Sequence, residues 1–188
     1  YIEIRCIDIN PFLPLGIDAE TMRKIDVFLV DAILSESPLC NEDGQRRNQE
    51  NLRRVVNEGR ATNLQLLTPE GEKPLEAVAR QLLNSMSKTA QTMDAEAGSD
   101  LHQQAVATAY ARIADPERTP SGRVLQEMRE TNTPFWQLAL NYSKQWHKDF
   151  LTNPLSPIEM AEFRTATAAS LNQQQAMEKD TQESFKTY

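Results

Sequence analysis

The pattern of apolar and polar positions divides the chain into one strand followed by about seven helices. Residues 1–9 are rich in Ile and Tyr, and their alternation predicts a strand with Glu3 and Arg5 on one face. The other face is mostly apolar and is expected to face a core. Asp18 is the predicted N-cap of a helix that reaches about Ser35. Apolar side chains recur there at helical spacing and predict a buried stripe: Met22, Ile25, Phe28, Leu29, Ala32 and Ile33.

The later helices are delimited by glycine, proline and hydroxyl residues. Gly59 and Gly98 are expected to end two of them. Three times a hydroxyl residue precedes a proline, the pairing typical of an N-cap and the first helical residue: Thr119-Pro120, Thr133-Pro134 and Ser156-Pro157. Residues 63–67 are ambiguous. Helices are therefore predicted over 45–58, 74–97 and 99–114, and from residues 120, 134 and 157 onward.

The predicted fold class is mainly α, with an N-terminal strand that has few possible partners in this chain. A strand normally pairs with neighbours through its backbone. We therefore expect residues 1–17 to be a strand and turn of a sheet built mostly by preceding polypeptide. Residues 18–188 are expected to form a helical region attached to that sheet.

The amino-acid composition limits which classes of binding partner are expected. The formal net charge is −7, which disfavours nucleic acid and anionic lipid surfaces, although a local basic pocket for a nucleotide is still allowed. No apolar run approaches the roughly 18 residues that a membrane-spanning helix needs. Two cysteines, Cys6 and Cys40, do not make a disulfide framework, so a cytoplasmic location is expected. The sequence leaves open whether Cys6 and Cys40 form a single disulfide bond.

The candidate chemistry lies at Glu3 and Arg5. Two residues apart on a strand, they project from one face. A carboxylate can bind a hard divalent cation, and a guanidinium can bind phosphate oxygens, so the pair suits phosphoryl transfer. The alternative is a neutralised ion pair on a solvated sheet face, which spacing alone favours.

The first sixteen residues resemble a motif of glutamate–cysteine ligases. In that family a Tyr-Ile-Glu-Val-Arg strand runs into Asp-Ile-Asn-Pro-Phe and then a Pro-x-Gly turn. This chain reads YIEIR at 1–5, DINPF at 8–12 and PLG at 14–16. Weaker similarity continues in NLRRVVNEGR at 51–60 and in the Gln/Glu-rich end. The resemblance is closest to the proteobacterial type and covers only the C-terminal part of the family's chain.

The resemblance implies an activity. Glutamate–cysteine ligases form γ-glutamylcysteine from L-glutamate, L-cysteine and ATP through γ-glutamyl phosphate, the first step of glutathione biosynthesis, on a fold similar to glutamine synthetase. By that likeness Glu3 is a Mg2+ ligand and Arg5 is the catalytic contact to the transferred phosphate. The other metal ligands lie on strands that this chain lacks. We therefore expect the chain alone to be inactive and its partner to be the missing N-terminal part of the same enzyme.

Other readings stay open beside this one. The chain could be a non-catalytic helical module whose strand adds to a partner's sheet, or part of a related carboxylate–amine ligase.

His102 and His147 fall on different predicted helices and are not expected to bind a metal. The arginines at 46, 47, 53 and 54 predict a solvated basic face, with a nucleotide contact as the less favoured alternative.

Overall fold

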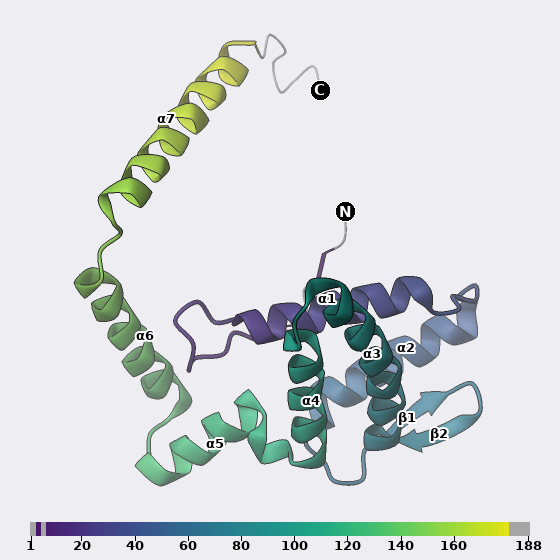
Figure 1. Cartoon of the computed structure of the whole chain (residues 1–188). Coiled ribbons are helices and arrows are strands. Elements are labelled where there is room, and N and C mark those ends of the chain that lie inside the picture. The colour runs from purple at the N-terminus through teal and green to yellow at the C-terminus, as the bar shows by residue number, and fades with distance from the viewer. Residues whose placement is uncertain (1–2, 5–6, 181–188) are drawn as a thin grey trace, which may run out of the picture. The chain divides into compact units, whose positions relative to one another are not determined.

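The computed structural model describes residues 3–4 and 7–180. The chain divides into two compact units, residues 1–143 and 144–188. Seven α-helices, a short 3-10 helix and one two-stranded sheet make up the described part of the chain (Figure 1). In chain order they are α1 (Ala19–Leu34), α2 (Glu42–Glu58), β1 (Gln65–Thr68), β2 (Gly71–Pro74), α3 (Leu75–Ala97), α4 (Leu101–Ala114), η1 (Pro116–Arg118), α5 (Pro120–Thr131), α6 (Phe135–Thr152) and α7 (Pro157–Asp180).

The predicted N-terminal strand is not found in the described residues. Residues 3–4 and 7–10 carry no regular secondary structure, and Ile4 is exposed rather than directed to a core. A β-strand is held by hydrogen bonds to a neighbouring strand. In the described part of the chain, the sheet pairs β1 with β2 and offers these residues no partner. The rest of the predicted strand, residues 1–2 and 5–6, lies outside the described residues.

Helix starts follow the predicted capping residues closely. The side chain of Asp18 accepts a hydrogen bond from the N–H of Thr21, and Thr119 caps α5 in the same way. Ser156 and Glu159 exchange backbone and side-chain hydrogen bonds across the first turn of α7, which is a capping box. Two predicted starts were wrong by a few residues. Helix α2 begins at Glu42, three residues before the predicted start, and α4 is preceded by Asp100 rather than capped by Ser99.

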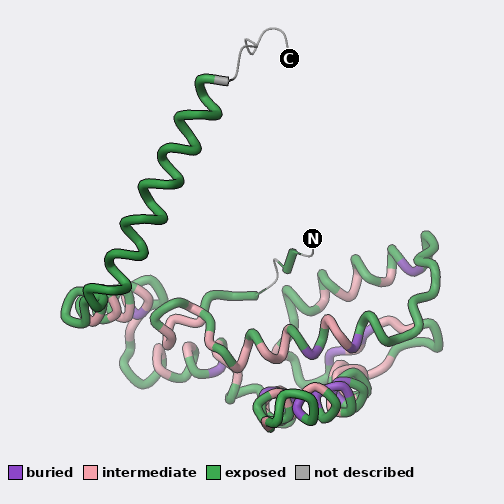
Figure 2. Tube along the Cα trace, turned by 45° about the horizontal axis from the view of Figure 1, so that its top comes forward, coloured by how far each residue is buried: buried purple, intermediate pink, exposed green. Residues whose placement is uncertain are grey.

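The hydrophobic core of the first unit lies where α1, α3 and α4 meet. It consists of Val27, Leu83, Met86, Ala90 and Val106. Most of the other buried residues lie on these helices or beside the hairpin (Figure 2).

A buried polar contact joins α1 to α3 within this core. The hydroxyls of Ser85 and Thr89 each donate to Oδ1 of Asp31 at 2.8 Å. These hydrogen bonds satisfy a carboxylate that is only 5% exposed and that would otherwise be costly to bury.

Two polar side chains of α2 bind the hairpin β1–β2. Asn51 of α2 hydrogen-bonds both the N–H and the carbonyl of Leu67, at 2.7 and 2.9 Å, so its amide serves the strand edge as a neighbouring strand would. Arg54 donates to the carbonyl of Gln65 and to Glu72, and it also pairs with Glu50. The predicted solvated face is therefore confirmed at Arg46 and Arg53, which are exposed and pair with carboxylates of α2, whereas Arg54 is partly buried against the hairpin.

A close approach of two backbones makes Gly122 sensitive to substitution. A Cβ there would lie 2.6 Å from the carbonyl oxygens of both Pro116 and Glu117. We expect Gly122→Ala to lower the free energy of unfolding by about 1–3 kcal/mol, because backbone of η1 must move. Urea denaturation monitored by circular dichroism measures the change.

Gly44 provides the matched control for Gly122. Both glycines are the third residue of a helix with an N–H capped by the N-cap side chain. A Cβ at Gly44 would meet only side-chain atoms, at 3.3 Å or more. Gly44→Ala should therefore raise the free energy of unfolding, by up to about 1 kcal/mol. Equal effects of the two substitutions would contradict this account.

Candidate functional site

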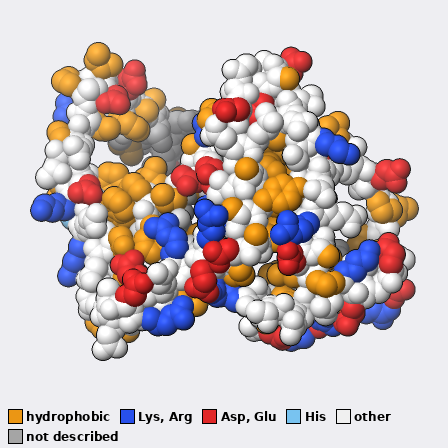
Figure 3. Space-filling view, turned by 60° about the horizontal axis from the view of Figure 1, so that its bottom comes forward, with side chains coloured by type: hydrophobic (Ala, Val, Ile, Leu, Met, Phe, Trp, Pro, Cys, Tyr) orange, Lys and Arg blue, Asp and Glu red, His pale blue; other side chains and the backbone are white. Residues whose placement is uncertain are grey.

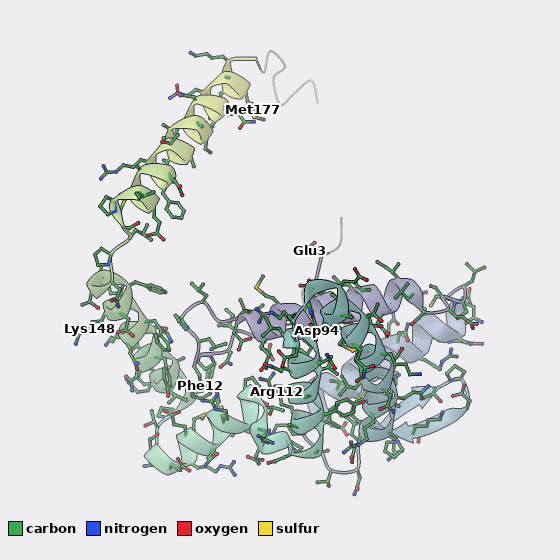
Figure 4. The ribbon with its side chains drawn as sticks, in the orientation of Figure 1. Glu3, Phe12, Asp94, Arg112, Lys148 and Met177 are labelled. Atoms are coloured by element: carbon green, nitrogen blue, oxygen red, sulfur yellow. The ribbon has the colours of Figure 1, made fainter. Side chains whose placement is uncertain are left out.

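The predicted site residues lie at the N-terminal end of the described chain. Glu3 is exposed, on the segment that leads into α1 (Figure 4). Arg5 lies outside the described residues, so the predicted pairing of the two on one face stays a prediction.

The segment that follows Glu3 forms a closed loop from Asn10 to Gly16. The N–H of Asn10 donates to the carbonyl of Gly16 at 2.9 Å, and the Asn10 side chain accepts from the N–H of Phe12. Gly16 has a φ of 73°, and a Cβ there would lie 2.7 Å from Cγ2 of Ile9. The two ends of the loop are therefore held together, and the chain enters α1 directly after it.

Phe12 attaches this loop to the C-terminal helices of the first unit. The guanidinium of Arg123 lies 4.1 Å above its ring, and the ring of Tyr142 meets it edge-on at 5.1 Å. The Tyr142 hydroxyl donates to Glu127 of α5. Burial and the Glu127 carboxylate raise the pKa of this hydroxyl. Residues from α5 and α6 thus determine where the chain after Glu3 and Arg5 runs.

The chemistry that this chain alone can offer is limited. The described residues include no group of three or more His, Cys, Asp or Glu side chains that could hold a metal ion. Glu3 supplies a hard oxygen donor of the kind Mg2+ takes, but one carboxylate does not fill an octahedral shell. The donor type of Glu3 fits Mg2+, and an ion bound there would need further oxygen ligands.

His102 has a structural role. Its ring Nδ1 lies 2.7 Å from Oδ1 of Asp94, a carboxylate at the end of α3 that also accepts from the backbone N–H groups of His102 and Gln103. Asp94 is 1% exposed and fastens the start of α4 to the end of α3. His102 thus takes part in the connection between α3 and α4.

The structure reveals two features that sequence analysis missed. One is the contact of Arg123 and Tyr142 with Phe12, which is more than a hundred residues from either in the sequence. The other is the approach of Lys24 in α1 to Arg112 in α4, where burial and the Arg112 guanidinium lower the pKa of Lys24. Neither contact leaves a local pattern, because each depends on how α1, α4, α5 and α6 pack.

Comparison with known proteins points to one family. The family model described as "Glutamate-cysteine ligase" matches residues 1–55. A glutamate–cysteine ligase of Pseudomonas paraeruginosa is 39% identical over 188 residues, which is 100% of this chain and 36% of that protein. One from a Janthinobacterium species is 37% identical over 179 residues, covering 95% of this chain and 34% of the relative. The chain thus spans about a third of the length of the curated relatives it matches.

The fold agrees with that family. A crystal structure of glutamate–cysteine ligase from Francisella tularensis, in complex with AMP, superposes with a TM-score of 0.82 over 94% of this chain and 34% of that one. The two sequences are 21% identical there, so this likeness concerns the fold. None of the helices in the described ranges is long and apolar enough to cross a membrane. Over its whole length, this chain matches the C-terminal part of proteobacterial glutamate–cysteine ligases, the family that its first sixteen residues resemble.

Proposed function

We propose that this chain is the C-terminal part of an ATP-dependent glutamate–cysteine ligase that forms γ-glutamylcysteine. The single observation that carries the proposal is the match over all 188 residues to ligases of that name, at 39% identity. The motif of residues 1–16 supports it, because it includes the two side chains to which the resemblance assigns chemistry. The AMP in the Francisella ligase supports nucleotide binding in the assembled enzyme.

The proposed roles follow from the chemistry of the two side chains. Glu3 is a Mg2+ ligand, and Mg2+, when bound, would offset charge on the phosphates of ATP. Arg5 contacts the phosphate in transfer, because its planar fork matches two phosphate oxygens. Residues 1–17 would belong to the catalytic antiparallel sheet of a glutamine-synthetase-like fold, with residues 18–188 as the helical C-terminal region. Such a sheet would provide the strand partners that residues 3–4 and 7–10 lack here.

The proposed reaction has two steps. The γ-carboxylate of glutamate attacks the γ-phosphorus of ATP, the bond to the β,γ-bridging oxygen breaks, and ADP leaves. The amino group of cysteine then attacks the carbonyl carbon of γ-glutamyl phosphate, loses a proton, and displaces phosphate. Arg5 would stabilise the charge on the phosphoryl group in the first step. Because ATP and free amino acids are held in the cytoplasm, we place the enzyme there.

A hybrid enzyme tests the proposal. In the hybrid ligase, this chain continues the part of the Pseudomonas paraeruginosa ligase that precedes the matched region, which we name the N-terminal ligase part. We expect the hybrid to release ADP only when glutamate and cysteine are both present and to form γ-glutamylcysteine, measured by mass spectrometry. The 188-residue chain alone should form none, because it supplies too few metal and substrate ligands.

Two results would contradict the proposal. A hybrid that folds cooperatively but forms no γ-glutamylcysteine would argue against the function. Product formed by the isolated chain would show that the chain already holds a complete site. If another amine replaced cysteine as the preferred substrate, the chain would belong to a related carboxylate–amine ligase instead.

A further inference from the structure

The apolar stripe predicted for α1 is largely uncovered within this chain. Val27 is fully buried, but Met22 is 54% exposed, Phe28 is 41% exposed and Ile33 is 75% exposed. Helices α3 and α4 cover only the Val27 side of α1. An apolar stripe at helical spacing normally packs against another element, so the uncovered side of α1 marks an interface.

A large groove lies beside α1 and is lined by Ile25 and Phe28 of the stripe, but not by Met22 or Ile33. Its walls come from the N-terminal segment, α1, α3 and α5, with Arg112 of α4 and Phe135 of α6, and its volume is about 1270 Å³. Apolar side chains dominate the walls: Ile4, Ile7, Ile25, Phe28, Leu82 and Leu125. Small-molecule sites occupy roughly 300–1,000 Å³, so this groove suits a polypeptide segment better than a metabolite. Figure 3 shows that hydrophobic side chains gather in exposed patches on the molecule.

The charged residues of the groove indicate what its occupant carries. Its lining includes Asp8, Lys24 and Arg112. Arg112 is paired with Glu20 at 3.4 Å. Lys24 is half-buried, and no carboxylate of the described residues forms an ion pair with it. Burial and the nearby Arg112 guanidinium lower the pKa of Lys24 more than the Glu20 and Asp18 carboxylates raise it, so its charged form is only partly compensated. An acidic side chain placed opposite Lys24 would complete that compensation.

We propose that this groove is the docking surface for the N-terminal ligase part, which inserts an apolar segment carrying a carboxylate opposite Lys24. The relatives have the polypeptide to do so, because this chain covers only 36% of their length and matches their C-terminal part. The groove is also lined by Ile4 and Ile7, at the end of the chain where that polypeptide would join. The inference rests on the proposed function and adds the surface through which the two parts assemble.

The test uses this chain and the N-terminal ligase part as two separate polypeptides. This chain, carrying an affinity tag, is co-expressed with the N-terminal ligase part, and the amount recovered per tagged chain is measured. Hydrogen exchange of the recovered complex is compared with that of the chain alone. We expect stable co-purification, with amides of α1 and α5 exchanging more slowly in the complex. Amides on the exposed side of α2 should exchange as before.

Substitutions inside and outside the groove show whether the groove itself is the docking surface. Leu125→Glu and Lys24→Glu should each lower the recovery at least tenfold. Val56→Glu is the control for the first, because Val56 is an exposed apolar residue of α2 outside the groove, and Lys88→Glu on α3 is the control for the second. Both controls should leave recovery unchanged. Circular dichroism and urea denaturation check that each variant folds.

Several outcomes would overturn the docking proposal. One is full recovery with both groove variants, and another is no co-purification of the wild-type pair. A third is a dimer of the chain alone, detected by light scattering and abolished by Leu125→Glu, which would assign the groove to a second copy. A pair that assembles through the groove but makes no γ-glutamylcysteine would instead refute the proposed function and leave the docking surface standing.

Discussion

Glu3→Gln in the hybrid ligase should lower kcat for γ-glutamylcysteine formation by roughly 100-fold or more, while the enzyme stays folded. Glutamine keeps the size of the side chain but removes the negative charge that a Mg2+ ligand supplies. Glu3 is exposed, so the substitution has little effect on packing. Steady-state assays over a range of Mg2+ concentrations measure the effect. Raising Mg2+ should recover part of the activity if the lost interaction is with the metal.

The control for Glu3→Gln is Glu36→Gln. Glu36 is an exposed carboxylate in the loop after α1, and it takes no part in the proposed site. Its substitution should leave kcat within about twofold of the parent hybrid, since surface changes of this kind usually have small effects. Similar losses from both substitutions would indicate a general electrostatic effect. Unchanged kcat in Glu3→Gln would remove Glu3 from the site.

Asp94→Asn should lower the Tm of the chain by roughly 5–10 °C. The Asp94 carboxylate accepts from donors at both oxygens: Ser99 and His102 at Oδ1, and Gln103 at Oδ2. An asparagine in the same position would place its NH2 group either against the donors of Ser99 and His102 or against the N–H of Gln103, depending on the orientation of the amide. A buried donor then faces a donor, and the connection between α3 and α4 weakens.

The same carboxylate predicts a change of stability with pH. Burial alone would raise the pKa of Asp94, but the N–H groups of Gln103 and His102, with the Ser99 hydroxyl, hold it well below its usual value of 3.8. A carboxyl with a lowered folded-state pKa stabilises the fold fully above its ordinary pKa and loses that contribution as pH falls. The Tm of the parent chain should therefore decline below about pH 4, and Asp94→Asn should flatten that decline.

Asp100→Asn is the matched control for Asp94→Asn. Asp100 is exposed six residues away and makes no side-chain capping hydrogen bond to α4. The same chemical change there should shift the Tm by no more than about 2 °C. Thermal melts followed by circular dichroism between pH 3 and pH 7 compare the three proteins. Equal shifts in both variants would show that Asp94 does not anchor α4.

Local signals in the sequence determined most of the helices. Asp18, Thr119 and Ser156 act as caps where their spacing predicted, because capping involves residues within one turn of each other. The family resemblance was equally readable, since it lies in the contiguous residues 1–16. Each of these features can be recognised from neighbouring residues alone.

Two predictions depend on polypeptide beyond the described residues. The strand predicted at residues 1–9 needs a neighbouring strand, which the described residues do not offer, so it stays a prediction for the assembled enzyme. The prediction that the apolar stripe of α1 is buried was wrong within the described part of the chain, where Met22 and Ile33 are exposed. The hairpin at residues 65–74 was not recognised, because each strand has only four residues and part of its support comes from Asn51 and Arg54 of α2.

The sequence by itself determined where most of the helices start and the family that the chain resembles, and it singled out Glu3 and Arg5 as the candidate chemistry. Only the tertiary structure showed that Arg123 and Tyr142 hold the loop after those residues, that Asp94 joins α3 to α4, and that Lys24 faces an apolar groove. The physical reason is the range of the interactions. Propensity and capping act within a few residues, whereas burial, ion pairing and grooves depend on which helices pack together.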